Sequence, residues 1–186
     1  WVHKDTGLRR FRLAYNEVAR KNSKSTLSSG IGLYMTAFDD EGGAEVYSAA
    51  TTRDQARIVF NDAQQMVRKS QSLSRIFGVH QRNIHHLKSG SKFEPLSADA
   101  NTLDGLNVSC GIIDELHAHQ KRDVYDVTET ATGAREQPLI FIITTAGSNK
   151  LGICYELREY AMKVLQGVVD DDSFFAAIFT LDEDDD

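Results

Sequence analysis

Two long segments of the chain carry apolar residues at the spacing of one face of an α-helix. One segment spans residues 25–38, and its apolar positions are Leu27, Ile31, Tyr34, Met35 and Phe38. The other spans residues 53–69 after a capping threonine, Thr52, and its apolar positions are Ala56, Val59, Phe60, Ala63 and Val67. This recurrence predicts two amphipathic helices, and residues 152–166 predict a third.

Short apolar runs between the helical segments predict strands over residues 11–19, 45–50, 108–113, 139–144 and 174–181. The run 139–144 is almost continuously apolar, which is typical of the centre of a parallel sheet. Residues 82–87 and 92–96 predict a hairpin around the turn 88–91. Strands that alternate with helices favour an α/β fold, with a mainly parallel central sheet and helices on both faces.

Composition sets broad limits on what this chain can be. Its 186 residues, 41% of them hydrophobic, suffice for one large domain with a substantial core. No apolar run approaches the ~20 residues that a membrane helix needs, so we expect no membrane partner. Cys110 and Cys154 are predicted to be reduced core residues of a cytosolic protein, and Phe174, Phe175 and Phe179 are also predicted to lie in the core.

Charge is unevenly distributed although the net charge is only −6. The first 24 residues contain a cluster of basic side chains, namely Lys4, Arg9, Arg10, Arg12, Arg20, Lys21 and Lys24. A basic patch can follow the phosphates of a nucleic acid even on an acidic protein. Alternatively, some of these basic residues belong to a phosphate-binding loop and the others to an ordinary solvent-exposed face. The sequence leaves both interpretations open.

The loop between strand 11–19 and helix 25–38 has the position of a phosphate-binding loop. Its residues Lys24 and Ser25 match the end of the P-loop consensus G-x-x-x-x-G-K-[ST]. In such a loop the lysine neutralises phosphate charge and the hydroxyl coordinates Mg²⁺, beside backbone N–H groups at a helix N-terminus. Ser23 replaces the consensus glycine and fits without strain only if its φ is negative. A basic surface turn is the alternative interpretation.

Acidic and hydroxyl residues follow two of the predicted strands. Asp114 and Glu115 end the strand 108–113, where an ATPase keeps a magnesium carboxylate and a water-activating carboxylate. The alternative is an acidic cap on the next helix. Thr144 and Thr145 end the strand 139–144 and either sense a γ-phosphate or form a turn. The His-x-His at residues 117–119 lacks a further ligand set, so we expect no metal other than Mg²⁺.

Five ordered segments together resemble the large terminase subunit of tailed bacteriophages. They are residues 18–26, 96–100, 103–107, 112–117 and 144–147. The resemblance spans nearly the whole chain, and the ordered set is far more specific than any single motif. It implies an additional-strand P-loop ATPase domain that drives double-stranded DNA into a procapsid.

The resemblance also implies the roles of individual residues. Glu115, Arg20 and Lys24 are the implied catalytic residues, and Ser25 and Asp114 the implied Mg²⁺ ligands. The implied nucleotide-binding positions, for the cofactor ATP, are Arg20, Lys21, Asn22, Ser23, Lys24, Ser25, Thr26, Thr144 and Thr145. Residues 144–146 match the coupling motif of the family.

The same resemblance gives expectations for the whole protein. Residues 1–181 are expected to form the ATPase domain, and residues 182–186 to begin an acidic connection to a C-terminal nuclease domain, so this chain itself should lack endonuclease activity. Expected partners are double-stranded DNA, the portal protein of the procapsid, the small terminase subunit and further copies in a homo-oligomeric ring. The expected location is the cytoplasm of the infected bacterial host.

The chain departs from the family pattern in places. Related terminases carry Arg-Gly where this chain has Asp104-Gly105, so a neighbouring subunit would supply the arginine, and Arg53, Arg82 and Arg135 are candidates. The adenine-contacting glutamine of the family would lie upstream of Trp1. Two alternative functions stay open: a helicase-like or other additional-strand nucleic-acid ATPase, and a weakly hydrolysing nucleotide-binding assembly module.

Overall fold

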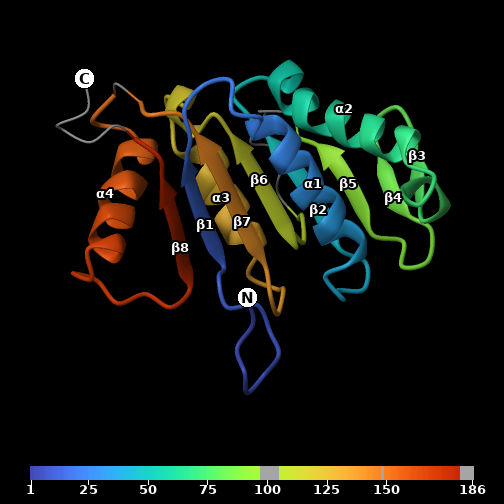
Figure 1. The fold of residues 1–186 in the computed structure, drawn as a ribbon, viewed down its shortest axis with the longest axis horizontal. Coiled ribbons are helices and arrows are strands. Elements are labelled where there is room, and N and C mark those ends of the chain that lie inside the picture. Colours follow the sequence, from blue (N-terminus) through green and yellow to red (C-terminus); the bar gives the residue numbers. More distant parts are fainter. Residues whose placement is uncertain (97–104, 148, 181–186) are drawn as a thin grey trace.

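One mixed eight-stranded sheet organises the protein (Figure 1). The computed structural model describes residues 1–96, 105–147 and 149–180. The strands are β1 Leu13–Glu17, β2 Glu45–Ala49, β3 Phe77–Val79, β4 Ile84–His86, β5 Lys92–Pro95, β6 Cys110–Asp114, β7 Leu139–Thr144 and β8 Phe174–Ile178. Their order in the sheet is β3-β4-β5-β2-β6-β7-β1-β8; β4 runs antiparallel to both of its neighbours, and all other pairs are parallel.

The position of β7 defines the class of the fold. This strand lies between β1, which precedes the predicted phosphate loop, and β6, which ends in the acidic pair. The register pairs Glu17 with Thr144 and Asp114 with Ile143. Because all three strands are parallel, their carboxyl ends lie side by side at one edge of the sheet. The predicted additional-strand arrangement is therefore confirmed.

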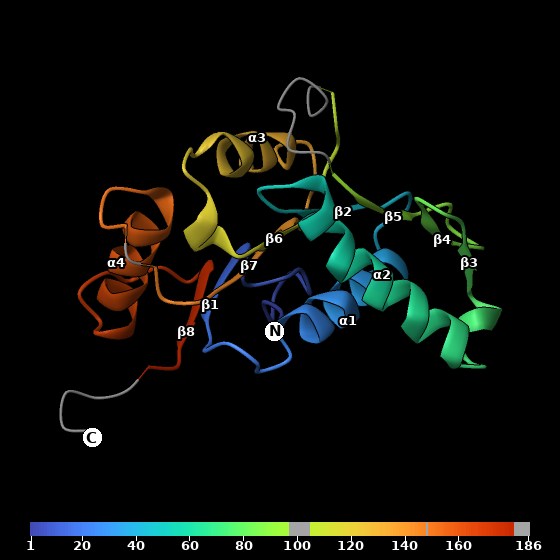
Figure 2. The ribbon, with the colours of Figure 1, turned by 90° about the horizontal axis from the view of Figure 1, so that it is seen from above.

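Helices cover both faces of the sheet, as predicted (Figure 2). The helices are α1 Lys24–Ala37 and α2 Arg53–Lys69 on one face, and α3 Asp123–Ala131 and α4 Ile153–Leu165 on the other. Two short 3₁₀ helices, η1 Leu73–Arg75 and η3 Leu116–Ala118, lie in the connections. Within the described ranges, no helix combines the length and the apolar composition required to cross a membrane.

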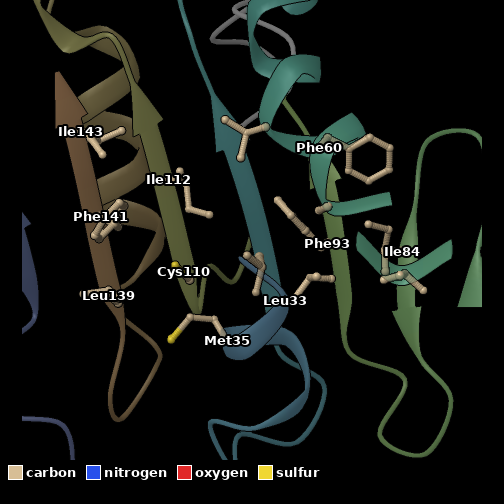
Figure 3. Packing of buried hydrophobic residues seen from close by; sticks show 14 of the residues in the cluster. Leu33, Met35, Phe60, Ile84, Phe93, Cys110, Ile112, Leu139, Phe141 and Ile143 are labelled. Carbon is tan, nitrogen blue, oxygen red and sulfur yellow. The ribbon is translucent and has the colours of Figure 1, made fainter. Parts of the chain in front are cut away.

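Side chains of β7 alternate between the two layers of the core. Leu139, Phe141 and Ile143 pack beneath α1 and α2 (Figure 3), whereas Ile140 and Ile142 pack against the α4 side. A strand buried on both faces is apolar at every position, which explains why the sequence of β7 lacks alternation.

Most predicted elements are confirmed, with ends that differ by a few residues. The helix predicted over residues 53–69 is α2, where the Thr52 hydroxyl accepts a hydrogen bond from the Gln55 N–H at 3.2 Å. The predicted hairpin is β4 and β5. The sequence interpretation missed β3 and α3. Cys110 and Cys154 are buried free thiols, as predicted, but Phe179 is 67% exposed, so its placement in the core was wrong.

The apolar positions predicted for α1 are only partly confirmed as buried: Met35 is 1% exposed and Ile31 packs against the core. Leu27, Tyr34 and Phe38 are about half exposed, and the face toward the sheet is formed largely by small residues, including Ser29 and Gly32. A Cβ on Gly32 would lie 2.6 Å from the Phe93 ring. Close approach of α1 to the sheet therefore requires a small residue at Gly32, while Leu33 and Met35 of the same helix pack into the core (Figure 3).

Candidate functional site

The carboxyl end of β7 is hydrogen-bonded on both sides to the segments predicted to carry chemistry. On one side the Val18 N–H donates to the Thr144 carbonyl at 2.9 Å, and on the other the Glu115 N–H donates to the Ile143 carbonyl at 2.9 Å. The sheet ladder thus fixes the start of the phosphate loop and the acidic pair on either side of one strand.

The loop 18–23 leads from β1 into α1 through two residues with left-handed backbone. Lys21 has φ 66° and Ser23 has φ 53°. Ser23 therefore lacks the negative φ that would leave it unstrained. Arg20 and Lys21 are exposed, and Asn22 donates from Nδ2 to the Ala19 carbonyl at 3.2 Å. A non-glycine residue in this region costs on the order of 1 kcal/mol. The turn that the consensus assigns to glycine is thus made here by serine, with strain.

The N-terminus of α1 has no side-chain cap. The Ser23 side chain makes no capping hydrogen bond, and the first turn contains no acidic residue. The first N–H groups of a helix have no partner within it and carry partial positive charge. An anion could therefore bind at this end of α1 through backbone N–H groups.

Lys24 opens α1 and points toward the acidic pair. Its side chain is 8% exposed, and its Nζ lies 3.5 Å from both the Val18 carbonyl oxygen and Glu115 Oε1. Ser25, half-buried, and Thr26, exposed, follow it in the first turn. Among the described residues, no hydrogen bond or ion pair joins the Ser25 or Thr26 side chain to Asp114 or Glu115. The structure therefore joins Lys24 directly to Glu115, whereas among the described residues it records no direct hydrogen bond between Ser25 and Asp114.

Asp114 is a buried carboxylate that is only partly compensated. Burial raises its pKa to about 6, with a further increase from the Glu115 charge, opposed by a backbone hydrogen bond and by Lys24. Its Oδ1 is buried and, within the described part of the chain, has no hydrogen-bond partner. Carboxylate oxygens are preferred ligands of Mg²⁺. An orphaned buried oxygen at this position fits a divalent cation.

Glu115 turns the chain out of β6 and lies among polar groups of three elements. Its φ of 53° is left-handed, so η3 begins immediately after it. One oxygen, Oε1, faces Lys24, and the other, Oε2, lies 3.1 Å from His117 Nδ1. That second contact is close but is not aligned as a hydrogen bond, because Oε2 has no hydrogen-bond partner among the described residues.

The predicted residues Thr144 and Thr145 reach the acidic pair through His117. The Thr144 hydroxyl oxygen accepts a hydrogen bond from the His117 backbone N–H at 3.1 Å and lies 3.1 Å from Nδ1. The Thr145 hydroxyl oxygen lies 3.3 Å from the same Nδ1. Sequence reasoning treated His117 only as part of a weak metal motif, although its place two residues after Glu115 was a usable signal.

A second group that sequence reasoning missed lies directly beneath the loop. Glu17 ends β1 and is 2% exposed; it accepts hydrogen bonds from Tyr15 Oη at 3.0 Å and from Arg158 Nε of α4 at 3.1 Å. A glutamate in an otherwise apolar strand was the available signal. The pairing connects α4 to the strand that carries the phosphate loop.

The cavity between α3 and α4 lies away from these residues. It has a volume of about 440 Å³ and is lined by Leu13, Ile140 and Phe174, the beginnings of β1, β7 and β8. Those positions are at the amino edge of the sheet, opposite the acidic pair. None of the candidate site residues lines it, so we assign it no part in the chemistry.

The three candidate arginines differ in their surroundings. Arg135 is held by the Asn107 and Gly43 carbonyls at 3.0 and 2.9 Å and by Glu41, so we do not propose it for a neighbouring site. Arg82 is exposed in the turn between β3 and β4. Arg53 begins α2. The Asp104 position and most of the segments 96–100 and 103–107 lie outside the described residues.

Comparison with known proteins is consistent with this geometry. A family model described as terminase large subunit, ATPase domain, matches residues 1–163. The large terminase subunit of Enterobacteria phage HK97 is 32% identical over 142 residues, which cover 74% of this chain and 28% of that protein.

Solved structures give the same result. The crystal structure of the HK97 bacteriophage large terminase has a TM-score of 0.81 at 28% identity, covering 95% of this chain and 37% of that one. The large terminase of a thermophilic bacteriophage, in complex with ADP, has a TM-score of 0.67 at 14% identity, covering 91% of this chain and 40% of that one, and this likeness shows the fold alone. The chain thus spans less than half the length of these relatives. Because the family model covers most of its length, the chain belongs to the terminase large subunit family, within the ATPase domain.

Proposed function

We propose that this chain is the ATP-hydrolysing motor domain of a terminase large subunit, which moves double-stranded DNA into a procapsid. The observation that carries the proposal is the meeting of Lys24 and Glu115, 3.5 Å apart, at the carboxyl edge of three parallel strands. A lysine beside a helix N-terminus and a carboxylate on the next strand but one are the two groups that ATP hydrolysis needs, one for the phosphates and one for the water.

The nucleotide would bind over the start of α1. The uncapped N–H groups of that helix and the ammonium group of Lys24 both favour the β- and γ-phosphates. Arg20 and Lys21 are exposed in the adjoining loop and add positive charge there. The large terminase of the thermophilic bacteriophage, which shares this fold, is described in complex with ADP.

The magnesium site would be formed by Asp114 and Ser25. Asp114 offers a buried, unpartnered oxygen, and the Ser25 hydroxyl lies in the first turn of α1. Mg²⁺ bound there would neutralise charge on the phosphate oxygens. The positive charge of the ion would oppose both causes of the raised pKa of Asp114, which are burial and the nearby charge of Glu115.

Glu115 would act on the attacking water. The carboxylate accepts a proton as the water oxygen bonds to the γ-phosphorus, and the bond from that phosphorus to the ADP oxygen breaks. In the structure Glu115 is held by Lys24, so phosphate binding would first have to draw Lys24 away. Thr144 and Thr145 do not contact Glu115 themselves but lie within hydrogen-bond distance of His117, which is next to it.

The wider assembly rests on family membership. We propose double-stranded DNA, the portal protein, the small terminase subunit and a homo-oligomeric ring as partners, in the cytoplasm of the infected host. We also retain the proposed domain division, in which residues 1–181 form the motor and a nuclease domain follows. Residues 182–186, the start of the proposed connection, lie outside the described residues.

Calorimetric titration with ATP and Mg²⁺ tests the nucleotide site. Lys24→Ala should weaken binding by about 1.5–3 kcal/mol, because charge-assisted hydrogen bonds to phosphate are lost. Lys69→Ala, at the exposed end of α2, removes a lysine elsewhere and serves as the matched control. Equal affinities for the two variants would contradict the assignment.

The catalytic assignment is tested by separating binding from turnover. Glu115→Gln should bind ATP at least as tightly as the wild type, since Lys24 loses a competing carboxylate, and should hydrolyse it at least ~100-fold more slowly. Asp114→Ala should lose the Mg²⁺ dependence of binding. Wild-type turnover by both variants would show that the acidic pair is structural.

A further inference from the structure

His117 occupies the junction between the acidic pair and the end of β7. Its ring atom Nδ1 has three oxygen atoms within reach: Thr144 Oγ1 at 3.1 Å, Thr145 Oγ1 at 3.3 Å and Glu115 Oε2 at 3.1 Å. The side chain is 22% exposed. A Cβ on Gly147 would lie 3.0 Å from the His117 Cβ, so a glycine at that position leaves room for the histidine.

The hydrogen bonds around Thr144 influence which nitrogen of the ring carries hydrogen. Thr144 Oγ1 donates its only proton to the Thr145 carbonyl at 3.0 Å and accepts from the His117 backbone N–H. Toward Nδ1 it can therefore only accept, and a carboxylate oxygen also only accepts. The neighbouring carboxylate, which can only accept, favours the tautomer in which His117 Nδ1 carries hydrogen, and that one hydrogen has competing acceptors.

In the structure Nδ1 lies within hydrogen-bond distance of both threonine hydroxyls. Glu115 Oε2 is equally close but unpartnered, while Glu115 Oε1 is held by Lys24. A triphosphate is a stronger partner for Lys24 than one carboxylate is. Once Lys24 turns to the phosphates, Glu115 loses its only ion-pair partner among the described residues apart from His117.

We propose that His117 is a positioning residue whose Nδ1–H passes from Thr144 to Glu115 when nucleotide draws Lys24 away, so that it aims the carboxylate at the water. This inference rests on the proposed function for its nucleotide-bound state. The two arrangements differ by a small rotation of one ring between acceptors already in place.

Substitution of the ring tests the positioning role. His117→Ala should lower ATP turnover about 10-fold or more, since a misplaced catalytic group costs rate, while the affinity for ATP stays within about 2-fold of wild type. His117→Asn places an amide where Nδ1 lies and should recover most of the turnover. His117→Gln places its amide near the Nε2 position and should not. His3→Ala, at an exposed position, is the control.

The rotation itself is tested without turnover, by ring-nitrogen NMR of His117. In nucleotide-free Lys24→Ala, Glu115 is already free of the lysine, so the His117 Nδ1 resonance should move to the position that the wild type shows with a non-hydrolysable ATP analogue. Identical spectra for the nucleotide-free wild type and Lys24→Ala would overturn the proposal, as would equal turnover of the Asn and Gln variants. Failure of the wild type to bind ATP would contradict the proposed function instead, and the comparison of the two nucleotide-free spectra would still decide the role of His117.

Discussion

Ser23 shows how this site departs locally from the pattern that its chemistry suggests. The residue before the phosphate-binding lysine has φ 53° and ψ 31°, a conformation that glycine adopts freely and serine does not. Its side chain makes no capping hydrogen bond that would offset the strain. The fold therefore holds the loop in shape against a local cost.

Replacing this serine should relieve that cost. Ser23→Gly is expected to raise the free energy of unfolding by about 0.5–1 kcal/mol, as measured by urea denaturation. Ser72→Gly is the matched control, because Ser72 is exposed with φ −70°, and there glycine should lower stability by about 0.4–1 kcal/mol. Equal effects at the two sites would show that Ser23 is unstrained.

Asp114 makes a separate, pH-dependent contribution at the residue scale. Its pKa is raised from 3.8 to about 6 in the folded protein, so the native state holds the proton more tightly than the unfolded chain. Stability then falls as pH rises from about 4 to 6, by about 2–3 kcal/mol for a shift of this size, and stays lower above that range.

Asp114→Asn removes the buried negative charge and with it the loss of stability at high pH. Without nucleotide and with a chelator present, the variant should be more stable than wild type by about 2–3 kcal/mol at pH 8 and nearly equal to it at pH 4. Denaturant titration at the two pH values measures the difference. Asp5→Asn, at an exposed position, is the control. A variant less stable than wild type at pH 8 would show that the buried carboxylate is compensated.

At the scale of elements, the packing of α1 depends on glycine at one position and not at another. Gly32 faces the sheet, where an added Cβ would lie 2.6 Å from the Phe93 ring and 3.2 Å from Ile112 Cδ1. Gly30, two residues earlier, has nothing within 4 Å of that position. The same substitution should therefore have opposite effects at the two positions.

Gly32→Ala should lower the free energy of unfolding by about 1–3 kcal/mol through overpacking. Gly30→Ala should raise it by roughly 0.5–1 kcal/mol, because alanine favours the helix. Thermal and urea denaturation of both variants provide the measurement. Destabilisation by both substitutions would mean that the exposed face of α1 is also packed.

The elements also show what could be predicted from sequence and why. Regular apolar spacing predicted the limits of α2, and an uninterrupted apolar run predicted β7 as an inner strand. The helix α1 was placed correctly, but Leu27, Tyr34 and Phe38 are about half exposed, because close packing through Ser29 and Gly32 has no apolar signature. The short helix α3 was missed because only Tyr125 and Thr128 of its residues are buried.

In the site, motif spacing predicted Lys24 and Glu115, which the structure brings together. The place of His117 two residues after Glu115 was a signal in the sequence, but its contact with Thr144 joins residues far apart along the chain. Motif spacing could not show that Arg135 is held by carbonyl groups at the opposite edge of the sheet. Such pairings depend on tertiary structure, which the spacing of residues along the chain does not contain.

At the scale of the whole molecule, the arrangement of the sheet suggests how neighbouring subunits would act on one another. Arg82 lies in the turn between β3 and β4, at the end of the sheet farthest from β1 and β8. Since Ile84 pairs with Phe93, this turn lies at the same edge at which β5 ends, the carboxyl edge that carries the phosphate loop. In a ring of subunits packed side by side, it would face the site of the next subunit.

Arg82 is exposed and makes no ion pair within the described ranges. An arginine supplied by a neighbour accelerates phosphoryl transfer by about 10³–10⁵-fold in ATPases that use one. We therefore predict slow hydrolysis by dilute chain, which accelerates with protein concentration and on assembly with procapsids and DNA. Arg82→Ala should remove that acceleration and leave the slow rate of dilute protein unchanged.

Mixing two variants that each lack the accelerated rate distinguishes an arginine supplied by a neighbouring subunit from one that acts within its own subunit. Lys24→Ala lacks a working site but keeps Arg82, and Arg82→Ala keeps its site but lacks the arginine, so a mixture should regain part of the assembled rate. Lys24→Ala mixed with Glu115→Gln is the control, because both changes damage the same site and no interface restores it. Turnover that is independent of concentration, with no gain in the first mixture, would mean that each subunit completes its own site.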